Sequence, residues 1–480
     1  MKIYQLYING GYQTASSGKV ADSLNPMTGE VYARVEQANK LDAKMALDSA
    51  SKAFETWKNT GPTQRELILL KAADIISQRA DELKELLIDE SGSTIFKAGY
   101  ETSHTPNFLR SMAGECRRVT GDTYPSDYPG VKSYSVRRPL GIVLAISPFN
   151  LPLLIGVRKV GWAIAAGNCV ILKPSEVTPV VGLKIAEIFT EAGLPAGVLN
   201  VLPAQGEDLG DVLIADPRVK KVSFTGSTMV GQTIAKTCAN YHTKVTLEMG
   251  GKNPLIVLND ADIDYAVNTA AFSNFFHQGQ VCMSGSRIIV EAGIYDEFVH
   301  RLAEKVHGIK YGNPREADVI VGPLIRASQP EFIQEQIDLA VASGAKLLVG
   351  GSSEGSVYLP TLLVDVTQKM SIFSTECFGP VASVIKANDH HHAIEIANNS
   401  EYGLSASVLT NDLQKSMLMV DSLEAGMVHV NGPSIRDEPV VPFGGVKNSG
   451  LGREGGKFSM DEFTEIKWVT IQTGQQQYPF

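Results

Sequence analysis

Residues 169–179 read CVILKPSEVTP, an apolar run followed by a short polar turn and by the pair Thr178-Pro179. The four leading apolar residues predict a buried strand. A threonine N-cap followed by proline at the first helical position predicts a helix start, and we expect this helix to end at Gly193, where glycine permits a left-handed backbone. An apolar run at 198–202 predicts the next strand. Strand, helix and strand in this order are typical of a parallel sheet.

The same alternation extends along the chain in both directions. Helical spacing of apolar residues from Asp42 to Glu90 predicts a pair of amphipathic helices. After the first unit, a strand at 219–224 leads through the turn 225–228 into a helix towards Cys238. The pattern predicts further strands at 245–248 and 255–258, and helices at 207–214, 262–276, 295–306, 329–342 and 413–423. For 480 residues, two α/β domains are the natural interpretation.

The composition argues against several classes of protein. The chain has 44% hydrophobic and 20% charged residues, and its formal net charge of -9 provides no basic surface for nucleic acid or anionic lipid. The most apolar stretch, 140–157, is interrupted by four polar or proline residues, so no membrane span is expected. Five cysteines without a Cys-x-x-Cys pair, and a start without a secretory apolar core, favour free thiols and a cytoplasmic location.

One cysteine lies in a turn suited to covalent chemistry. Cys282 is in HQGQVCMSGS at 277–286, where flanking glycines can expose a thiol and offer backbone N–H groups to an oxyanion. The residues alone leave alternatives open. Cys116, beside two arginines, has the better local charge setting for a thiolate, and His277 is a rival base five residues from Cys282.

Two polar residues follow predicted strands. Asn150 ends the segment after the apolar run 142–146, where a parallel sheet presents its carboxyl edge to ligands. Glu248 ends the strand at 245–248 before two glycines, a position that would suit a general base. Each has a simpler interpretation, a turn asparagine for the first and a solvated strand-end carboxylate for the second.

Phosphate binding is predicted at a glycine turn. The one Gly-x-Gly-x-x-Gly, at 450–455, follows a loop instead of a strand, so we do not interpret it as a dinucleotide fingerprint. The turn Gly226-Ser227 does lie between a predicted strand and a helix N-terminus. Lys173 and Glu176 can bind ribose hydroxyls, and a carboxylate there repels a 2′-phosphate, which favours NAD over NADP. The histidines at 390–392 point in different directions on a helix, so no metal is expected.

Taken together, these segments resemble the aldehyde dehydrogenase superfamily, from about Asp22 to Val469. The motifs, in order, are Pro148-Phe149-Asn150, Lys173-Pro174-Ser175-Glu176, Phe224-Thr225-Gly226-Ser227, Leu247-Glu248-Met249-Gly250-Gly251-Lys252, Gly279-Gln280-Val281-Cys282, Glu376-Cys377-Phe378-Gly379-Pro380 and Pro442-Phe443-Gly444-Gly445.

The resemblance implies a function for named residues. Cys282 is the nucleophile, Glu248 the general base, Asn150 an oxyanion donor with the Cys282 N–H, and Lys159 a lysine near the base. The implied residues for NAD, with NADP as a second possibility, are Ser147, Pro148, Phe149, Lys173, Ser175, Glu176, Gly206, Phe224, Gly226, Ser227, Glu376 and Phe378.

The resemblance also implies an α/β fold of three parts and a homodimer or homotetramer. The expected parts are a Rossmann-type cofactor domain (1–118 and 139–249), a catalytic domain (250–445) and a small β oligomerisation element (119–138 and 463–480).

Two departures from the common pattern bear on the substrate. Phe149 replaces a tryptophan often found before the asparagine, and Arg158 stands where some members carry an aromatic residue in the substrate tunnel. The stretch FFHQGQ at 275–280, with Met283 and Ser284, is most similar to benzaldehyde and vanillin dehydrogenases. We therefore expect oxidation of an aromatic aldehyde through a Cys282 thioester. The alternatives are a coenzyme A-acylating semialdehyde dehydrogenase and a catalytically idle protein of the same fold.

Overall fold

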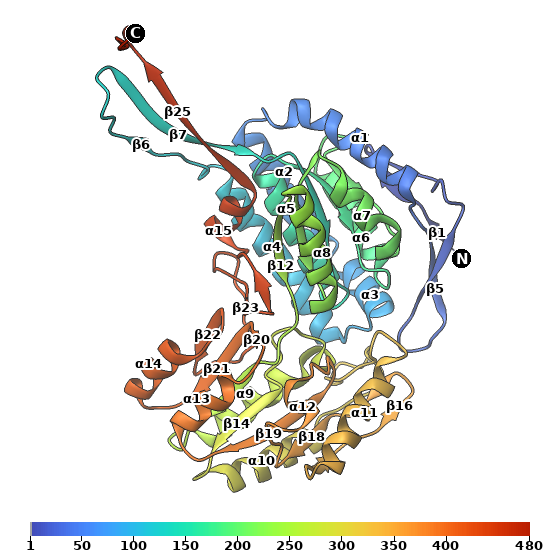
Figure 1. The fold of residues 1–480 in the computed structure, drawn as a ribbon. Coiled ribbons are helices and arrows are strands. Elements are labelled where there is room, and N and C mark those ends of the chain that lie inside the picture. The colour runs from blue at the N-terminus through green and yellow to red at the C-terminus, as the bar shows by residue number, and fades with distance from the viewer. Residues whose placement is uncertain (1) are drawn as a thin grey trace.

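The computed structural model of the chain describes residues 2–480, with the side chains of residues 207 and 208 outside the description. Two large sheets with helices around them form the upper and lower parts of the molecule in Figure 1, and a three-stranded arm projects from the upper part. No helix among the described residues is long and apolar enough to cross a membrane.

The first sheet has eight strands in the order β24-β12-β11-β8-β9-β10-β2-β3, with a parallel centre from β12 to β10 and antiparallel strands at both edges. From β8 the chain adds strands first on one side and then, from β11, on the other, so the order reverses between β8 and β11. Open parallel sheets bind ligands outside the carboxyl ends of their strands at such a reversal. The strands are β2 (Leu6–Ile8), β3 (Gly11–Gln13), β8 (Ile142–Ile146), β9 (Cys169–Lys173), β10 (Leu199–Val201), β11 (Val219–Thr225), β12 (Lys244–Glu248) and β24 (Gly450–Leu451).

The second sheet has seven strands in the order β15-β18-β19-β14-β13-β21-β22, and all its pairs are parallel except β15 with β18. Its central strands are buried on both faces because helices cover them, as near-continuous apolar runs predict. They are β13 (Pro254–Val257), β14 (Arg287–Glu291), β15 (Lys346–Val349), β18 (Thr361–Val364), β19 (Val381–Ala387), β21 (Ser405–Leu409) and β22 (Met427–Val430).

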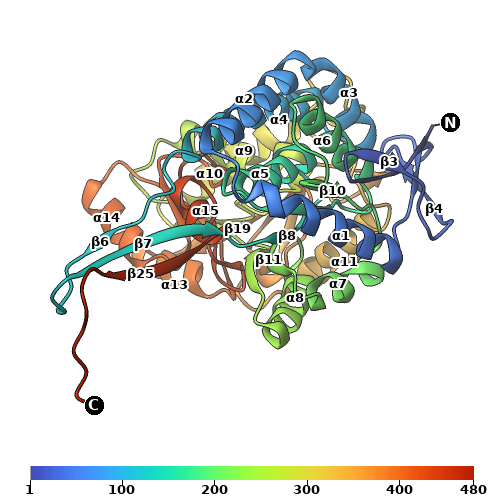
Figure 2. The same ribbon diagram turned by 90° about the horizontal axis from the view of Figure 1, so that it is seen from above.

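Four small sheets complete the strands. The arm consists of β25, β7 and β6, and its strand β25 pairs with β7 along nine residues, so that it stands clear of the body in Figures 1 and 2. The bounds are β6 (Thr123–Tyr124), β7 (Val131–Pro139) and β25 (Thr464–Gln472) for the arm, β1 (Ile3–Tyr4), β4 (Val20–Leu24) and β5 (Val31–Glu36) near the N-terminus, and β16 (Ser353–Glu354) with β17 (Val357–Tyr358) and β20 (Tyr402–Gly403) with β23 (Val446–Lys447).

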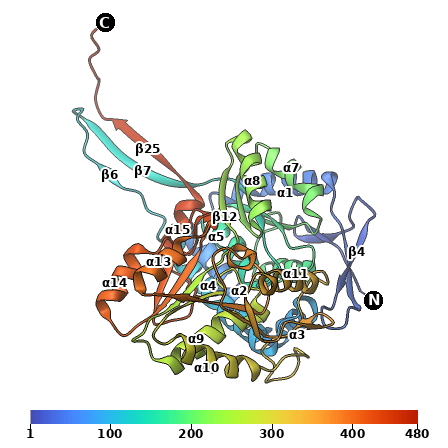
Figure 3. The same cartoon turned by 60° about the horizontal axis from the view of Figure 1, so that its bottom comes forward.

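The helices follow the predicted alternation. Those packed around the first sheet are α1 (Lys40–Trp57), α2 (Pro62–Gln78), α3 (Ala80–Ser91), α4 (Ile95–Glu115), α5 (Pro152–Ala165), α6 (Pro179–Glu191), α7 (Gly206–Ala215), α8 (Thr228–Tyr241) and α15 (Gly456–Glu462). Those around the second are α9 (Ile263–Phe275), the short 3₁₀ helix η1 (Phe276–Gly279), α10 (Tyr295–His307), α11 (Gln329–Ala342), α12 (Ser371–Ser374), α13 (His390–Asn398) and α14 (Leu413–Ser422). Figure 3 shows α9 and α10 lying side by side at the lower face.

One sequence prediction about the helices was wrong. The segment from Asp42 to Glu90 forms three helices, because Gly61-Pro62 starts α2 and the chain bends again at Arg79. Thr178 does occupy the N-cap of α6, yet its side chain makes no capping hydrogen bond. The buried Glu90 carboxylate accepts the N–H groups of Val180 and Val181 instead, both at 2.8 Å.

Candidate active site

The first group of predicted residues lies at the order reversal of the first sheet. Ser147 to Asn150 directly follow β8, and Gly226-Ser227 directly follow β11, its neighbour in the sheet. The Asn150 amide is buried, and its Nδ2 donates to the carbonyl of Gln280 at 2.9 Å. An amide NH₂ carries two hydrogens, so one donor of Asn150 stays available next to the Cys282 segment.

Cys282 is held by a strained turn. His277, Gln278 and Gly279 all have positive φ (50°, 55° and 71°), a left-handed backbone that non-glycine residues adopt at a cost. The side-chain amide of Gln278 fixes this turn because it donates to the carbonyls of Gly92 and Pro323, both at 3.0 Å.

The thiol after this turn is half-buried. Its apolar neighbours are Phe276, Val281, Met283, Leu404 and Phe443, with Tyr100, Met427 and Ile435 at the edge.

Asn253 is a site residue that the sequence analysis did not single out. Its Nδ2 donates to the carbonyls of Cys282 and Ser284, at 2.8 and 2.9 Å, and so fixes the backbone from Cys282 to Ser284. The available signal was its place directly after the Gly250-Gly251-Lys252 run.

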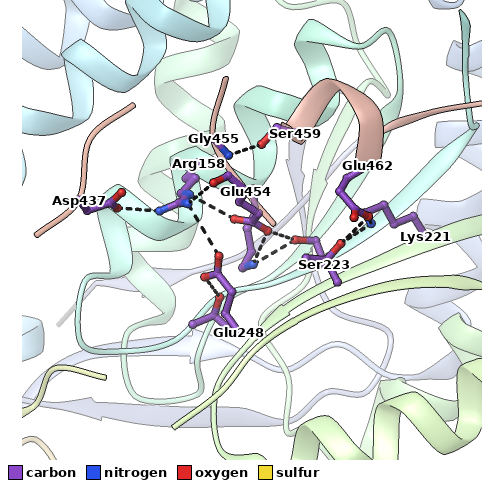
Figure 4. A network of polar contacts seen from close by, with 12 residues as sticks. Arg158, Lys221, Ser223, Glu248, Asp437, Glu454, Gly455, Ser459 and Glu462 are labelled. Carbon is purple, nitrogen blue, oxygen red and sulfur yellow. Dashed lines mark hydrogen bonds and ion pairs between the residues drawn. The ribbon is translucent and has the colours of Figure 1, made fainter. Parts of the chain in front are cut away.

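Glu248 and Lys159 belong to one buried polar network. Figure 4 labels its members Glu248, Arg158 and Glu454. Glu248 Oε2 accepts from Thr225 Oγ1 at 2.9 Å, and its Oε1 lies 3.8 Å from Nη2 of Arg158. Lys159 Nζ donates to Ser223 Oγ at 3.0 Å and to Glu454 Oε1 at 3.1 Å. Burial and the Glu454 charge raise the pKa of Glu248 to about 7, against the lowering effect of Arg158 and Lys159.

Glu454 and Asp437 were also missed by the sequence analysis. Glu454 lies inside the glycine-rich stretch 450–455, which packs against α5 and places this carboxylate beside Lys159. Asp437 accepts from Arg158 Nη1 at 2.7 Å. Only the glycine spacing around Glu454 hinted at a constrained loop, and nothing local marked Asp437.

The rival thiol and the rival base do not fit. Cys116 is 2% exposed, and burial raises its pKa to about 12. Its neighbours Arg117 and Arg118 pair with Glu66 and Glu115 instead, so the local charge argument for a Cys116 thiolate was wrong.

His277 is a poor base because burial, with the Lys97 charge, holds the pKa of its ring well below the usual value. Burial, followed by the charges of Glu248 and Glu376, raises the pKa of Cys282. The thiol therefore rests in its protonated form until a base accepts the proton.

The predicted cofactor residues fall in two groups. Lys173 ends β9 and is buried, and Glu176 nearby pairs with Arg326 at 2.6 Å. Ser175 accepts from the Val177 N–H. Gly206 begins α7, and Phe224 lies in β11. At Gly226 an added Cβ would lie 2.6 Å from the Phe224 ring, so only glycine fits there.

The second group brings Phe149, which follows β8 of the first sheet, together with Glu376 and Phe378, which precede β19 of the second sheet. Phe149 and Phe378 meet edge to face with ring centroids 5.7 Å apart. Glu376 accepts from the Gly251 N–H at 3.0 Å, and burial raises its pKa to about 7. Gly250 has no room for a side chain because an added Cβ would collide with this carboxylate.

The N-terminus of α8 has no side-chain cap and can face a phosphate. The buried Glu101 carboxylate accepts the first N–H groups of α5, and the buried Glu90 carboxylate accepts those of α6. Ser227, the N-cap of α8, makes no such capping bond. This donor set, next to Lys173 and the switch between β8 and β11, fits a dinucleotide. Among the residues described, no group of three His, Cys, Asp or Glu side chains is arranged to hold a metal ion.

The model of the aldehyde dehydrogenase family matches residues 12–469. The chain belongs to the aldehyde dehydrogenase family. The chain is an NAD(P)-dependent aldehyde oxidoreductase.

Similar proteins cover the chain from end to end. It is 41% identical to a vanillin dehydrogenase of Pseudomonas fluorescens over 477 residues, 99% of both chains. It is 39% identical to a benzaldehyde dehydrogenase of Bacillus subtilis over 475 residues, 99% of this chain and 98% of the other. Among solved structures, a salicylaldehyde dehydrogenase from Pseudomonas putida G7, complexed with salicylaldehyde, matches with a TM-score of 0.98 and 38% identity over 100% of both chains. The predicted family, fold class and reaction type are thereby confirmed.

Proposed function

We propose that the chain oxidises an aromatic aldehyde to its carboxylate with Cys282 as nucleophile and Glu248 as general base. The observation that supports these roles most is that the Asn150 amide donates to the carbonyl of Gln280, two residues before Cys282, while the buried Glu248 is close enough for its charge to raise the pKa of the Cys282 thiol. In this proposal Asn150 and the Cys282 N–H stabilise the oxyanion, and Lys159 pairs with Glu454, whose charge helps to raise the pKa of the base.

The residues' tasks follow in order. The half-buried Cys282 thiol gives its proton to water and its sulfur attacks the carbonyl carbon, while the second Asn150 hydrogen binds the developing oxyanion. After oxidation the acyl group remains on the sulfur as a thioester. Glu248 then accepts a proton from the attacking water, and the carbon–sulfur bond breaks to release the carboxylate and the Cys282 thiol.

For the cofactor we propose NAD, with NADP as a weaker second. Its nicotinamide supplies the hydride acceptor when bound. Lys173, Ser175 and Glu176 would bind the adenosine ribose and Gly226-Ser227 the pyrophosphate. The remaining proposed contacts are Ser147, Pro148, Phe149, Gly206, Phe224, Glu376 and Phe378. The Glu176 carboxylate disfavours a 2′-phosphate, but its ion pair with Arg326 offsets part of that repulsion.

The aromatic substrate class is supported by the side chains near the thiol. Phe276, which packs in the Cys282 cluster, meets Phe96, Tyr100 and Phe272 with ring centroids 5.4 to 5.9 Å apart. The similar proteins named for vanillin, benzaldehyde and salicylaldehyde point to the same class. A panel of aromatic, aliphatic and semialdehyde substrates, run with NAD and NADP, tests class and cofactor together.

The Cys282→Ala variant is the decisive test of the nucleophile. We expect NADH formation from benzaldehyde, followed by absorbance, to fall to the background rate because no other described cysteine lies in this cluster. The buried Cys238→Ala on α8 is the matched control and retains turnover. Near-normal turnover of Cys282→Ala would rule out the mechanism.

We also propose the division of the chain and its assembly. Residues 1–118 and 139–249 form the cofactor domain, 250–445 the catalytic domain, and 119–138 with 463–480 an oligomerisation element that joins copies into a homodimer or homotetramer. The projecting arm with exposed apolar side chains supports the last part. Five free cysteines support a reducing compartment, and we propose the cytoplasm.

A further inference from the structure

Five buried charged side chains, including that of the proposed base Glu248, form one cluster. Figure 4 labels four of them, Arg158, Glu248, Asp437 and Glu454. All five side chains are at least nine-tenths buried, and they carry two cations against three carboxylates; they are Arg158, Lys159, Glu248, Asp437 and Glu454. When all of them are ionised, one negative charge stays uncompensated away from water. Because such a charge is costly, the cluster favours binding one proton.

The extra proton does not go to Glu454. Burial raises the pKa of this carboxyl, but the charges of Lys159 and Arg158 outweigh burial and hold the pKa at about 2. The contacts explain this result, since Lys159 Nζ lies 3.1 Å and Arg158 Nε 3.2 Å from its two oxygens. Two carboxyls remain to share the proton. Burial raises the pKa of Asp437 to about 6 and that of Glu248 to about 7.

Arg158 connects these two carboxyls. Its Nη1 bonds to Asp437 Oδ2 at 2.7 Å, while its Nη2 faces Glu248 Oε1 at 3.8 Å and donates to the Glu454 carbonyl at 3.1 Å. The guanidinium also stacks on Phe443, 4.5 Å from the ring centroid, which fixes its plane. Both Asp437 Oδ1 and Glu248 Oε1 are buried without a hydrogen-bond partner. A buried acceptor without a partner makes the ionised form depend strongly on neighbouring charges.

The charged and polar groups around Glu248 come from four segments. They are Arg158 and Lys159 on α5, Thr225 on β11, Glu454 before α15, and the Cys282 thiol, whose own pKa the Glu248 charge raises. Asp437 is the outermost member and contacts Glu248 only through Arg158.

We propose that Asp437, acting through Arg158, is a positioning residue that sets the pH range over which Glu248 works as the base in thioester hydrolysis. This inference rests on the proposed functions of Cys282 and Glu248. The Asp437 carboxylate pairs with one side of the Arg158 guanidinium. Its negative charge thereby reduces the electrostatic stabilisation that Arg158 gives to an ionised Glu248. A base that ionises too easily is a weak acceptor for the proton of water, so Asp437 keeps Glu248 basic enough.

Two substitutions should shift the pH at which Glu248 ionises in opposite directions. In Asp437→Asn the amide oxygen still accepts from Arg158, but the charge is gone, so Glu248 ionises at lower pH. In Arg158→Gln the cation that faces Glu248 is gone, so Glu248 ionises at higher pH. We expect the acidic limb of the hydrolysis rate to move by about one pH unit down or up respectively, a tenfold rate change on that limb. Arg158→Lys restores the charge and should return most of the shift.

The experiment is a single turnover of the full-length enzyme in excess over benzaldehyde with NAD, from about pH 5 to 9. NADH absorbance follows the steps up to oxidation, and benzoate in quenched samples follows hydrolysis. Glu438→Gln is the matched control, since this neighbouring carboxylate is exposed and pairs with Arg436. It should leave the hydrolysis profile unchanged.

The outcomes separate the hypotheses. If Asp437→Asn lowers the melting temperature but leaves the acidic limb where it was, its role is only structural and the inference fails. The same holds if both substitutions move the limb in one direction. If Arg158→Gln does not fold, Asp437→Asn decides alone. Absence of NADH formation in the wild type, or its persistence in Cys282→Ala, would refute the proposed function itself.

Discussion

In the proposed reaction, Glu248 is needed for hydrolysis of the thioester but not for the attack and oxidation that precede it. Attack by Cys282 and oxidation need an ionised sulfur and an oxyanion site, whereas hydrolysis needs a base for water. Glu248 is buried beside a cation pair on α5, and its pKa of about 7 suits the second task at neutral pH. Because the base acts in its ionised form, hydrolysis should accelerate as pH rises through about 7.

We therefore expect Glu248→Gln to separate the two steps. One equivalent of NADH per active site should form as a burst, and steady turnover should then fall by about 100-fold or more because no base activates water. Stopped-flow absorbance of NADH measures both phases. A variant that shows no burst would mean that Glu248 acts before oxidation, as the base that deprotonates Cys282.

Among single residues, the sequence revealed those whose position is local. Glu248 ends a predicted strand and Asn150 follows one by four residues, so the strand ends bring both to the same edge of the sheet. Arg158 and Asp437, in contrast, are 279 positions apart, and their pairing depends on how the two sheets are packed together. No local pattern encodes such a contact, so the buried charge cluster became visible only in the fold.

At the scale of elements, the helix N-termini around the first sheet also depend on long-range contacts that no local sequence pattern predicts. Thr178-Pro179 marks the start of α6 correctly because backbone restriction by proline is local. The group that satisfies its N–H donors is Glu90, at the end of α3, some 90 residues earlier in the chain. Glu101 on α4 does the same for α5 through Leu153 and Leu154, at 2.7 and 2.9 Å.

Glu90→Gln should therefore destabilise the fold. The amide retains one acceptor oxygen but turns the other position into a donor, which leaves a buried N–H of Val180 or Val181 without a partner. We expect a loss of about 1–3 kcal/mol in the free energy of unfolding, measured by urea denaturation. Glu85→Gln on the same helix is the control, since its exposed ion pair with Arg315 contributes at most about 1 kcal/mol. Equal stability of the two variants would contradict the capping role.

At the scale of the whole molecule, the arm formed by β6, β7 and β25 is the part that packing against the two large sheets does not stabilise. Its strands bury little against the two sheets, and β25 carries Ile466 and Trp468 at 56% and 70% exposure. Residues two apart on a strand share one face, so these side chains form one apolar surface. An apolar strand surface held in water at the end of a long ribbon favours association with another copy of the chain.

Trp468→Lys tests this interpretation of the arm. A lysine on the apolar face would have to lose its hydration at the interface between copies, so we expect dissociation to smaller species at micromolar concentration, measured by sedimentation velocity. Lys467→Gln, on the opposite face of β25, is the control and should sediment like the wild type. The body of the variant should remain folded, because Trp468 is 70% exposed and its side-chain hydrogen bond to Ser133 of β7 lies within the arm. A wild-type protein that is already monomeric, or a variant with unchanged sedimentation, would show that this face of the arm does not hold the copies together.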